Sequence, residues 1–271
     1  MFGEPPRSDY DVRFTLFGFP VRISPWFWII LAIFGMQNEI NDMQIWLMQI
    51  LCWVAAAFVS ILVHELGHAL VLSKYFGART WIVLYGMGGL ACHDQRYSKR
   101  IPQTMGEIAI SAAGPFAGFA LVAALILVLI ACGIPVIGSI EYYAGLIPFP
   151  YMYADLSGFS SVLPKHIWVM LVLFVNYLFF ISLFWGMFNL LPIYPLDGGQ
   201  ISREIFLTFD RRSGVVNSLW LSVIVGCGIA VLGLSQWITV ENMAGFPFIA
   251  ILFGYLAYQS YQMLGIYTRF R

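Results

Sequence analysis

Three residues of the sequence have the types and the spacing that metal-assisted hydrolysis requires. They lie in His64-Glu65-Leu66-Gly67-His68, an HExxH sequence. Residues four apart lie one above the other on a helix, so both imidazoles can reach one metal ion. Glu65 is offset by one position and can approach a water molecule bound to that metal instead. The pattern predicts that His64 and His68 bind zinc and that Glu65 is the general base.

A plainer interpretation is that these three polar residues mark a helix end that meets water. The flanking sequence argues against it, because residues 55–63 before the motif and 69–72 after it are apolar. Ionisable side chains in such a segment are costly unless they are paired or bound to a metal. We therefore expect a metal site at this position.

A third zinc ligand must come from elsewhere in the chain, because catalytic zinc has three protein ligands and an open position for water. Asp197 is the preferred candidate: two prolines end the preceding helix, and a Gly-Gly pair follows the aspartate and leaves room beside a ligand. Ionised Asp197 and Glu65 would also balance a +2 charge. From spacing alone, an ordinary turn aspartate that begins a helix over 199–209 fits equally well.

Two further histidines, His93 and His166, are alternative candidates for the third ligand. His93 lies in a charged stretch, His-Asp-Gln-Arg, that is typical of a solvated turn. His166 falls on the opposite side of the membrane in the arrangement described below. We therefore prefer Asp197 to either histidine.

The composition indicates a polytopic membrane protein of all-α class. Hydrophobic residues make up 60% of the 271 residues and charged residues only 10%, too few to cover the surface of a soluble domain. Apolar runs over 116–130 and 168–188 are typical of transmembrane helices. The four cysteines are scattered without CxxC spacing, which excludes a thiolate zinc site or a disulfide framework. No basic patch indicates nucleic-acid binding.

The apolar segments predict about six transmembrane helices, of which the first is short. In this six-span arrangement every Lys and Arg except Lys165 falls on the same side of the membrane. The positive-inside rule then predicts that the N- and C-termini are cytoplasmic, in a multi-pass protein of the cell membrane. The expected segments are residues 25–36, 43–74, 105–133, 165–191, 214–234 and 245–263.

Small β-hairpins are expected between or before the helices. The alternating stretch 13–24 predicts a hairpin at the membrane interface, and the glycine-broken run 81–90 predicts another after the HExxH helix. Non-helical backbone at membrane depth is tolerated only against protein or a wet cavity. The hairpin at 81–90 can either bind substrate by strand addition or merely seal the cavity. The outer loop 134–164 shows no obvious domain.

The motifs together resemble the site-2 protease family of intramembrane zinc metalloproteases, also called M50 peptidases. The resemblance covers about 57–205: the HExxH motif, the small-residue stretch Ser111-Ala-Ala-Gly-Pro115 and the segment 189–199. It implies that Asp197 is the third zinc ligand. It also implies that Asn189 lies near the catalytic water or the developing oxyanion, although a helix cap or an interhelical contact would also explain that residue. Gly118 departs from the family pattern, which often has asparagine there.

The resemblance implies a single membrane-embedded peptidase domain over 1–271. Its three-helix catalytic core would lie at about 43–205, with peripheral helices at 25–36, 214–234 and 245–263. One Zn²⁺ per chain, bound by His64, His68 and Asp197, would supply the water that Glu65 activates. The expected partners are a membrane-protein substrate and the lipid bilayer, with no nucleic acid. The sequence does not indicate an oligomeric state.

Two other functions remain open at this point. A non-proteolytic hydrolase acting on a lipid amide could use the same zinc and water, although the segment 189–199 argues against it. A transporter or scaffold that retained a zinc site would not need Glu65. Replacing Glu65 with Gln separates the enzymes from the scaffold.

Overall fold

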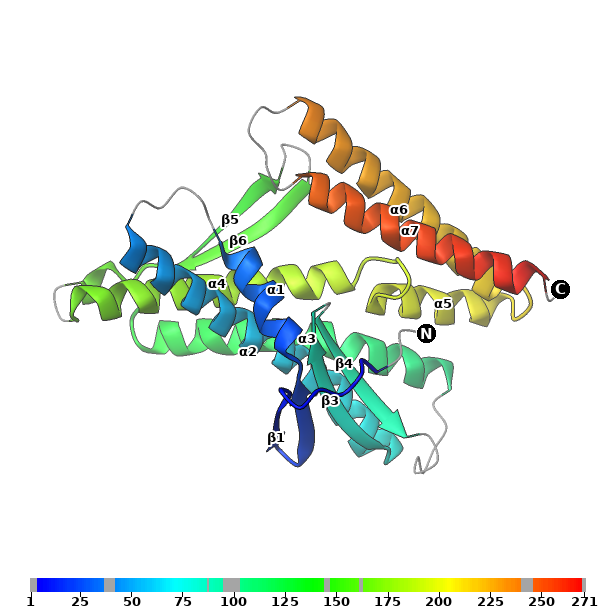
Figure 1. The fold of residues 1–271 in the computed structure, drawn as a ribbon, viewed down its shortest axis with the longest axis horizontal. Coiled ribbons are helices and arrows are strands. Elements are labelled where there is room, and N and C mark those ends of the chain that lie inside the picture. Colours follow the sequence, from blue (N-terminus) through cyan, green and yellow to red (C-terminus); the bar gives the residue numbers. More distant parts are fainter. Residues whose placement is uncertain are drawn as a thin grey trace. The chain divides into compact units, whose positions relative to one another are not determined.

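A computed structural model of the chain describes residues 4–36, 42–86, 88–94, 103–143, 147–160, 163–239 and 246–269. The chain divides into two compact units. The first contains Met1–Ile101 and Ala113–Gly186, and the second contains Pro102–Ala112 and Met187–Arg271. Figure 1 shows the elements of both units, which are described separately below.

Four helices of the described residues are long and apolar enough to cross a membrane. They are α2 (Met43–Phe76), α3 (Thr104–Ala131), α4 (Lys165–Asn189) and α6 (Gly214–Thr239). Helix α1 (Pro25–Gly35) is apolar but has only 11 residues. Helix α7 (Phe246–Arg269) corresponds to the sixth expected segment and is not among the four. The chain is thus an integral membrane protein of mostly helical fold, with four candidate spans.

The first unit contains a four-stranded sheet in the order β1-β2-β3-β4. Antiparallel hairpins join β1 (Val12–Leu16) to β2 (Phe19–Ile23) and β3 (Arg79–Tyr85) to β4 (Gly88–Asp94). The two hairpins are not separate, because β2 pairs in parallel with β3, with Val21 opposite Ile82. Strand β3 therefore has a partner on both sides, and β4 is an edge strand of the described sheet.

Helix α2 begins and ends at well-defined caps. The Asp42 carboxylate accepts hydrogen bonds from the backbone N–H groups of Gln44 and Ile45, as an N-cap residue does. Gly77 ends the helix in the left-handed conformation (φ 65°), which glycine adopts without steric cost. The helix presents one side to the sheet and to α1, and their shared core includes Phe27, Ile61 and Ile82.

The loop 134–164 contains a further hairpin that the sequence did not predict. Strand β5 (Val136–Tyr143) pairs antiparallel with β6 (Ile147–Ala154), and a short 3-10 turn follows at Ser157–Phe159. Two side chains of α4 attach this region: Asn176 accepts a hydrogen bond from the Ala154 N–H (2.9 Å), and the Trp168 indole donates to the Leu156 carbonyl (2.9 Å).

The second unit is built on α5 (Asp197–Phe209), α6 and α7. Helices α6 and α7 lie side by side, as Figure 1 shows in orange and red. Their backbones approach closely at Gly226, where an added Cβ would lie 3.1 Å from the Cβ of Ala257. Small residues commonly allow such close packing between membrane helices. The core of this unit contains Ile193, Phe253 and Leu256.

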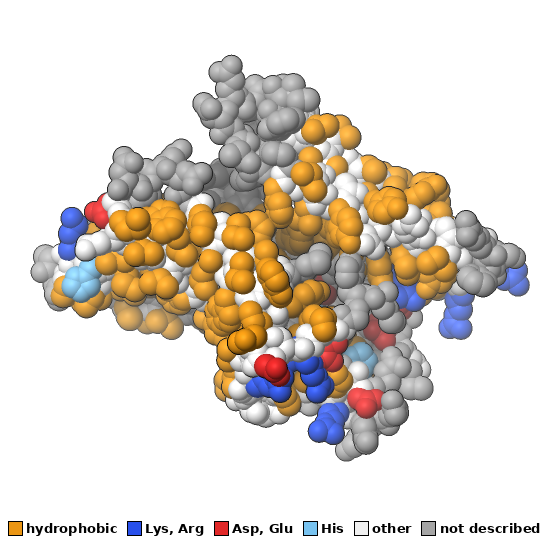
Figure 2. All heavy atoms as spheres, in the orientation of Figure 1, with side chains coloured by type: hydrophobic (Ala, Val, Ile, Leu, Met, Phe, Trp, Pro, Cys, Tyr) orange, Lys and Arg blue, Asp and Glu red, His pale blue; other side chains and the backbone are white. Residues whose placement is uncertain are grey.

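The surface of the first unit is apolar over its helices. Figure 2 shows hydrophobic side chains covering α1 and the N-terminal part of α2, with charged side chains near the strands and at the opposite end of the helices. Trp26 and Ile33 of α1 and Leu51 of α2 are among the exposed apolar residues. Since an aqueous surface rarely exposes so continuous an apolar layer, lipid is the solvent that suits these helices.

Candidate metal centre

Helix α2 carries both predicted histidine ligands and the predicted base on successive turns. His64, Glu65 and His68 are only 3%, 5% and 8% exposed. The interpretation of these residues as a helix end in water was therefore wrong: α2 continues to Phe76 beyond them. Three buried polar side chains on one helix need partners or a ligand.

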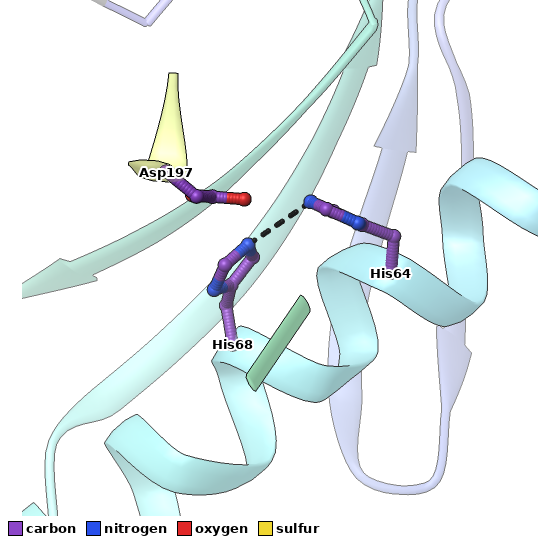
Figure 3. A group of neighbouring side chains, drawn as sticks. All are labelled: His64, His68 and Asp197. Carbon is purple, nitrogen blue, oxygen red and sulfur yellow. Dashed lines mark hydrogen bonds between the residues drawn. The ribbon is translucent and has the colours of Figure 1, made fainter. Parts of the chain in front are cut away.

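The two histidines face one point. Their Nε2 atoms are 3.2 Å apart, and Figure 3 shows the rings turned toward each other from neighbouring turns of α2. Two nitrogen ligands at about 2.0–2.1 Å from a tetrahedral zinc ion are separated by about 3.3 Å. The distance between the nitrogens thus fits two imidazoles that share one zinc ion.

Helix α3 comes closest to the two histidines at Gly114, which has no side chain. A Cβ atom there would lie 2.6 Å from Cε1 of His68 and 2.7 Å from Nε2 of His64, so only glycine fits. Gly67, which directly precedes His68 in α2, allows a similar approach, because its Cβ would lie 2.8 Å from that of Ala117. The sequence analysis noted a small-residue stretch here, and Gly114 of that stretch lies against the predicted ligands.

Strand β4 covers the predicted base. A Cβ on Gly89 would lie 2.5 Å from Oε1 of Glu65, so the strand backbone passes directly over the carboxylate. Burial raises the pKa of Tyr85, and the negative charge of Glu65 raises it further. Burial likewise raises the pKa of Cys92 to about 12, with smaller contributions from the charges of Glu4 and Glu65. Both neighbours are therefore uncharged at neutral pH.

Asp197 is the first residue of α5. The preceding chain folds back on this first turn, because a Cβ on Gly199 would lie 2.5 Å from the Ile193 carbonyl carbon and from the Tyr194 nitrogen. The ligand atoms offered by His64, His68 and Asp197 lie within 4.8 Å of one another. Among the described residues, no other group of three or more His, Cys, Asp or Glu residues could hold a metal ion.

The remaining predicted residues are also placed. His93 is an exposed residue of β4 opposite Thr80, and His166 is an exposed residue at the start of α4. Neither belongs to a candidate metal group. Asn189 is the last residue of α4 and is 9% exposed, so its amide lies in a largely buried environment.

Sequence reasoning missed two residues that touch the predicted catalytic side chains. Gly89 contacts Glu65, and Trp185 of α4 lies edge-on to the ring of His64, with ring centroids 6.4 Å apart. Gly88, next to Gly89, would place a Cβ 2.8 Å from the Trp185 ring. The paired glycines in a short apolar run were the only signal in the sequence for this close approach.

The helices and the paired histidines define the class of protein: a polytopic membrane protein with a buried zinc-binding motif. The family model of peptidase family M50 matches residues 53–232. The chain belongs to this family, and the resemblance inferred from its motifs is confirmed.

Relatives agree with this assignment. A zinc metalloprotease of Methanocaldococcus jannaschii is 26% identical over 83% of this chain and 53% of its own length. A candidate zinc metalloprotease of Synechocystis is 24% identical over 78% of this chain and 50% of its own. The chain thus spans about half the length of these curated relatives. The solved structure of the site-2 protease from M. jannaschii matches with a TM-score of 0.53 and 25% identity, covering 93% of this chain and 95% of that one.

Proposed function

We propose that this chain is an intramembrane zinc metalloendopeptidase that cleaves transmembrane or membrane-proximal segments of membrane proteins. The observation that carries the proposal is the pair of buried imidazoles, 3.2 Å apart, beside a buried carboxylate in a chain of family M50. The zinc metalloprotease relatives and the site-2 protease fold support the same activity.

We assign His64, His68 and Asp197 as the ligands of one zinc ion per chain. The ligand atoms of these three residues form the candidate metal group described above. Two neutral nitrogens and one carboxylate are a donor set found in catalytic zinc sites. When bound, zinc lowers the pKa of its water toward about 7 and polarises a carbonyl.

Glu65 would move the proton. Its carboxylate accepts a proton from the attacking water and returns it to the leaving nitrogen of the peptide bond. The contact with Gly89 limits where the carboxylate can lie, so the base is held in one place before substrate arrives. Exclusion of bulk water by the buried surroundings strengthens each of these interactions.

Asn189 would stabilise the developing negative charge on the carbonyl oxygen. The amide is nearly buried, and its N–H groups can donate hydrogen bonds to an oxyanion. A helix cap or an interhelical contact is the alternative role. Asn189→Ala should lower kcat and leave the zinc content intact in the first case, and change only the thermal stability in the second.

The substrate segment would bind as an added strand at the free edge of β4. A transmembrane substrate hides its peptide bonds within a helix, so the scissile segment must unwind and be held extended. Strand β4 is an edge of the described sheet and passes over Glu65 at Gly89. Strand β3 cannot accept a further strand, because β2 and β4 occupy both of its sides.

Cross-linking tests this binding mode. A photo-reactive amino acid at Leu90 or Ala91 of β4 should capture the substrate, and the same group at exposed Arg79 of β3 should not. Equal capture from all three positions would contradict strand addition and leave the hairpin as a seal over the cavity.

We further propose that residues 1–271 form one membrane-embedded peptidase domain with six spans and both termini in the cytoplasm. The core would comprise 43–205, with peripheral helices at 25–36, 214–234 and 245–263. The distribution of Lys and Arg supports this topology. A membrane-impermeant reagent should label single cysteines introduced at positions 10 and 268 only after the cytoplasmic side of the membrane is made accessible.

The activity is tested by comparing membrane-protein fragments in cells that carry the native protein or Glu65→Gln. Fragments that depend on Glu65 identify substrates, and one of these with a single span is then incubated with each purified protein. The native protein should cleave it. Glu65→Gln should retain zinc but lose activity by about 10²–10⁴-fold.

The same comparison separates the alternatives. A lipid-amide hydrolase would change lipid composition between the two strains without changing protein fragments. A scaffold or transporter that only retains zinc would give the same phenotype with Glu65 or Gln. Either result would overturn the proposed proteolysis.

A further inference from the structure

The loop that precedes Asp197 is attached to two helices by buried serines. Ser222 of α6 is 1% exposed and Ser260 of α7 is 0% exposed. The Tyr194 N–H donates to the Ser222 hydroxyl (3.0 Å), and the Ser260 hydroxyl donates to the Tyr194 carbonyl (3.2 Å). The backbone N–H and the carbonyl of Tyr194 are thus both contacted by serine side chains, one from α6 and one from α7.

Each serine also has a carbonyl partner in its own helix. The Ser222 hydroxyl lies 2.9 Å from the Ser218 carbonyl and 3.3 Å from the Pro192 carbonyl, so it can donate to one of them while it accepts from the Tyr194 N–H. The single proton of the Ser260 hydroxyl is shared between the Leu256 carbonyl (3.0 Å) and the Tyr194 carbonyl (3.2 Å). Because a bond to the carbonyl four residues earlier is enough to satisfy a serine hydroxyl within a helix, the contacts with Tyr194 are not required by the serines and instead hold the loop.

The position of Tyr194 is transmitted to Asp197 through close backbone contacts. Ile193 is completely buried, and its carbonyl accepts a hydrogen bond from the Leu196 N–H (2.8 Å). The Tyr194 nitrogen lies 2.5 Å from the point a Cβ on Gly199 would occupy. Since Gly199 belongs to the first turn of α5, a shift of the loop would move the turn that begins at Asp197.

We propose that Ser222 and Ser260 are positioning residues for the metal site: they hold the Tyr194 peptide and thereby set the place of the Asp197 carboxylate. The inference rests on the proposed role of Asp197 as the third zinc ligand. It gives the peripheral helices α6 and α7 an indirect role in metal binding, because the three proposed ligands all lie on other helices. Groups that orient a metal ligand typically change metal affinity by about 10–100-fold when removed.

The test uses the full chain in detergent with zinc as the probe. Ser222→Ala, Ser260→Ala and the double variant are compared with Ser218→Ala, a matched control. Ser218 is also a buried serine of α6 (3% exposed), but its hydroxyl bonds only to the Val215 carbonyl of its own helix (2.8 Å). Zinc dissociation constants from chelator competition, kcat and KM, and the unfolding temperature are measured for each protein.

We expect the double variant to bind zinc about 10-fold or more weakly, with kcat reduced and KM little changed, while Ser218→Ala binds zinc as the native protein does. Native zinc affinity in the double variant, with or without a lower unfolding temperature, would overturn the inference. If the double variant does not fold, the single variants decide. If neither of those folds, the serines support the whole unit and the inference is also overturned.

A parallel Asp197→Ala variant separates this inference from the proposed ligand set. Native zinc affinity in Asp197→Ala would show that Asp197 is not a ligand, and the proposed function would need another third ligand. Weakened zinc binding in Asp197→Ala but not in the serine variants would leave the ligand set intact and reject only the positioning role.

Discussion

Gly114 of α3 lies so close to His68 of α2 that a Cβ on the glycine would be 2.6 Å from Cε1 of the imidazole. The same Cβ would be 2.7 Å from Nε2 of His64. The missing side chain at 114 therefore creates the space in which the two rings converge. The small-residue stretch of α3 is in this respect part of the metal centre as well as a packing surface.

Gly114→Ala should weaken zinc binding. A methyl group at this position can be accommodated only if one of the rings turns away, which separates the two Nε2 atoms. We expect the zinc dissociation constant to rise by at least about 10-fold, with a corresponding loss of activity. Zinc content after gel filtration and chelator competition measure the effect.

Gly118→Ala is the matched control for this substitution. Gly118 lies one turn further along α3, and its nearest neighbour for an added Cβ is the Ser182 carbonyl oxygen at 3.4 Å, an ordinary contact. We expect native zinc affinity in this variant. The same zinc loss in both variants would show that α3 tolerates no added volume, and that the contact with the histidines is not the cause.

Gly89→Ala should reduce catalysis while zinc remains bound. The new methyl group would lie 2.5 Å from Oε1 and 2.6 Å from Cδ of Glu65, so the carboxylate must move. Displacement of a general base lowers kcat by up to about 10²–10⁴-fold. Zinc content and kcat are measured on the same preparation. Gly86→Ala, where the nearest atom is 3.4 Å away on Ile30, should keep native kcat.

The helix that bears both histidines could be predicted directly from the sequence. The spacing of His64 and His68 is local and periodic, and helix geometry alone brings their side chains together. The observed bounds of α2, α3 and α6 lie within a few residues of the predicted bounds, because the long apolar segments mark where a membrane helix begins and ends.

The contacts between distant segments did not follow from the sequence. The pairing of β2 with β3 joins strands separated by α1 and α2, and no local pattern specifies such a partner. The contact of Gly89 with Glu65 depends on that sheet. Likewise, Ser222 and Ser260 are ordinary small residues of apolar helices, and only the folded second unit brings them to Tyr194.

The hydrogen bond between Ser60 of α2 and Ser182 of α4 should contribute modestly to stability. The two buried hydroxyls are 2.8 Å apart. Hydrogen bonds between membrane helices average about 0.6 kcal/mol, so we expect a coupling energy of that size in a double-mutant cycle of the two Ser→Ala changes. Unfolding in mixed detergent measures it. A coupling energy of zero would show that this hydrogen bond contributes nothing to the contact between α2 and α4.

The ion pair between Asp11 and Arg22 should give the N-terminal hairpin a pH-dependent stability. The Arg22 guanidinium donates to the Asp11 carboxylate (2.9 Å) and also binds Glu4. Although burial acts to raise the pKa of Asp11, the hydrogen bonds and charge of Arg22 and the Ser8 N–H outweigh it and lower that pKa.

The stabilisation by this ion pair is therefore complete above the ordinary pKa of about 3.9 and is lost as the pH falls through the lower pKa of the folded protein. At pH 7 Asp11→Asn should unfold up to about 3 °C below the native protein, and this difference should disappear near pH 2. Exposed Asp9→Asn should show no such difference at either pH, and a constant gap for Asp11→Asn would rule out the ion pair as its cause.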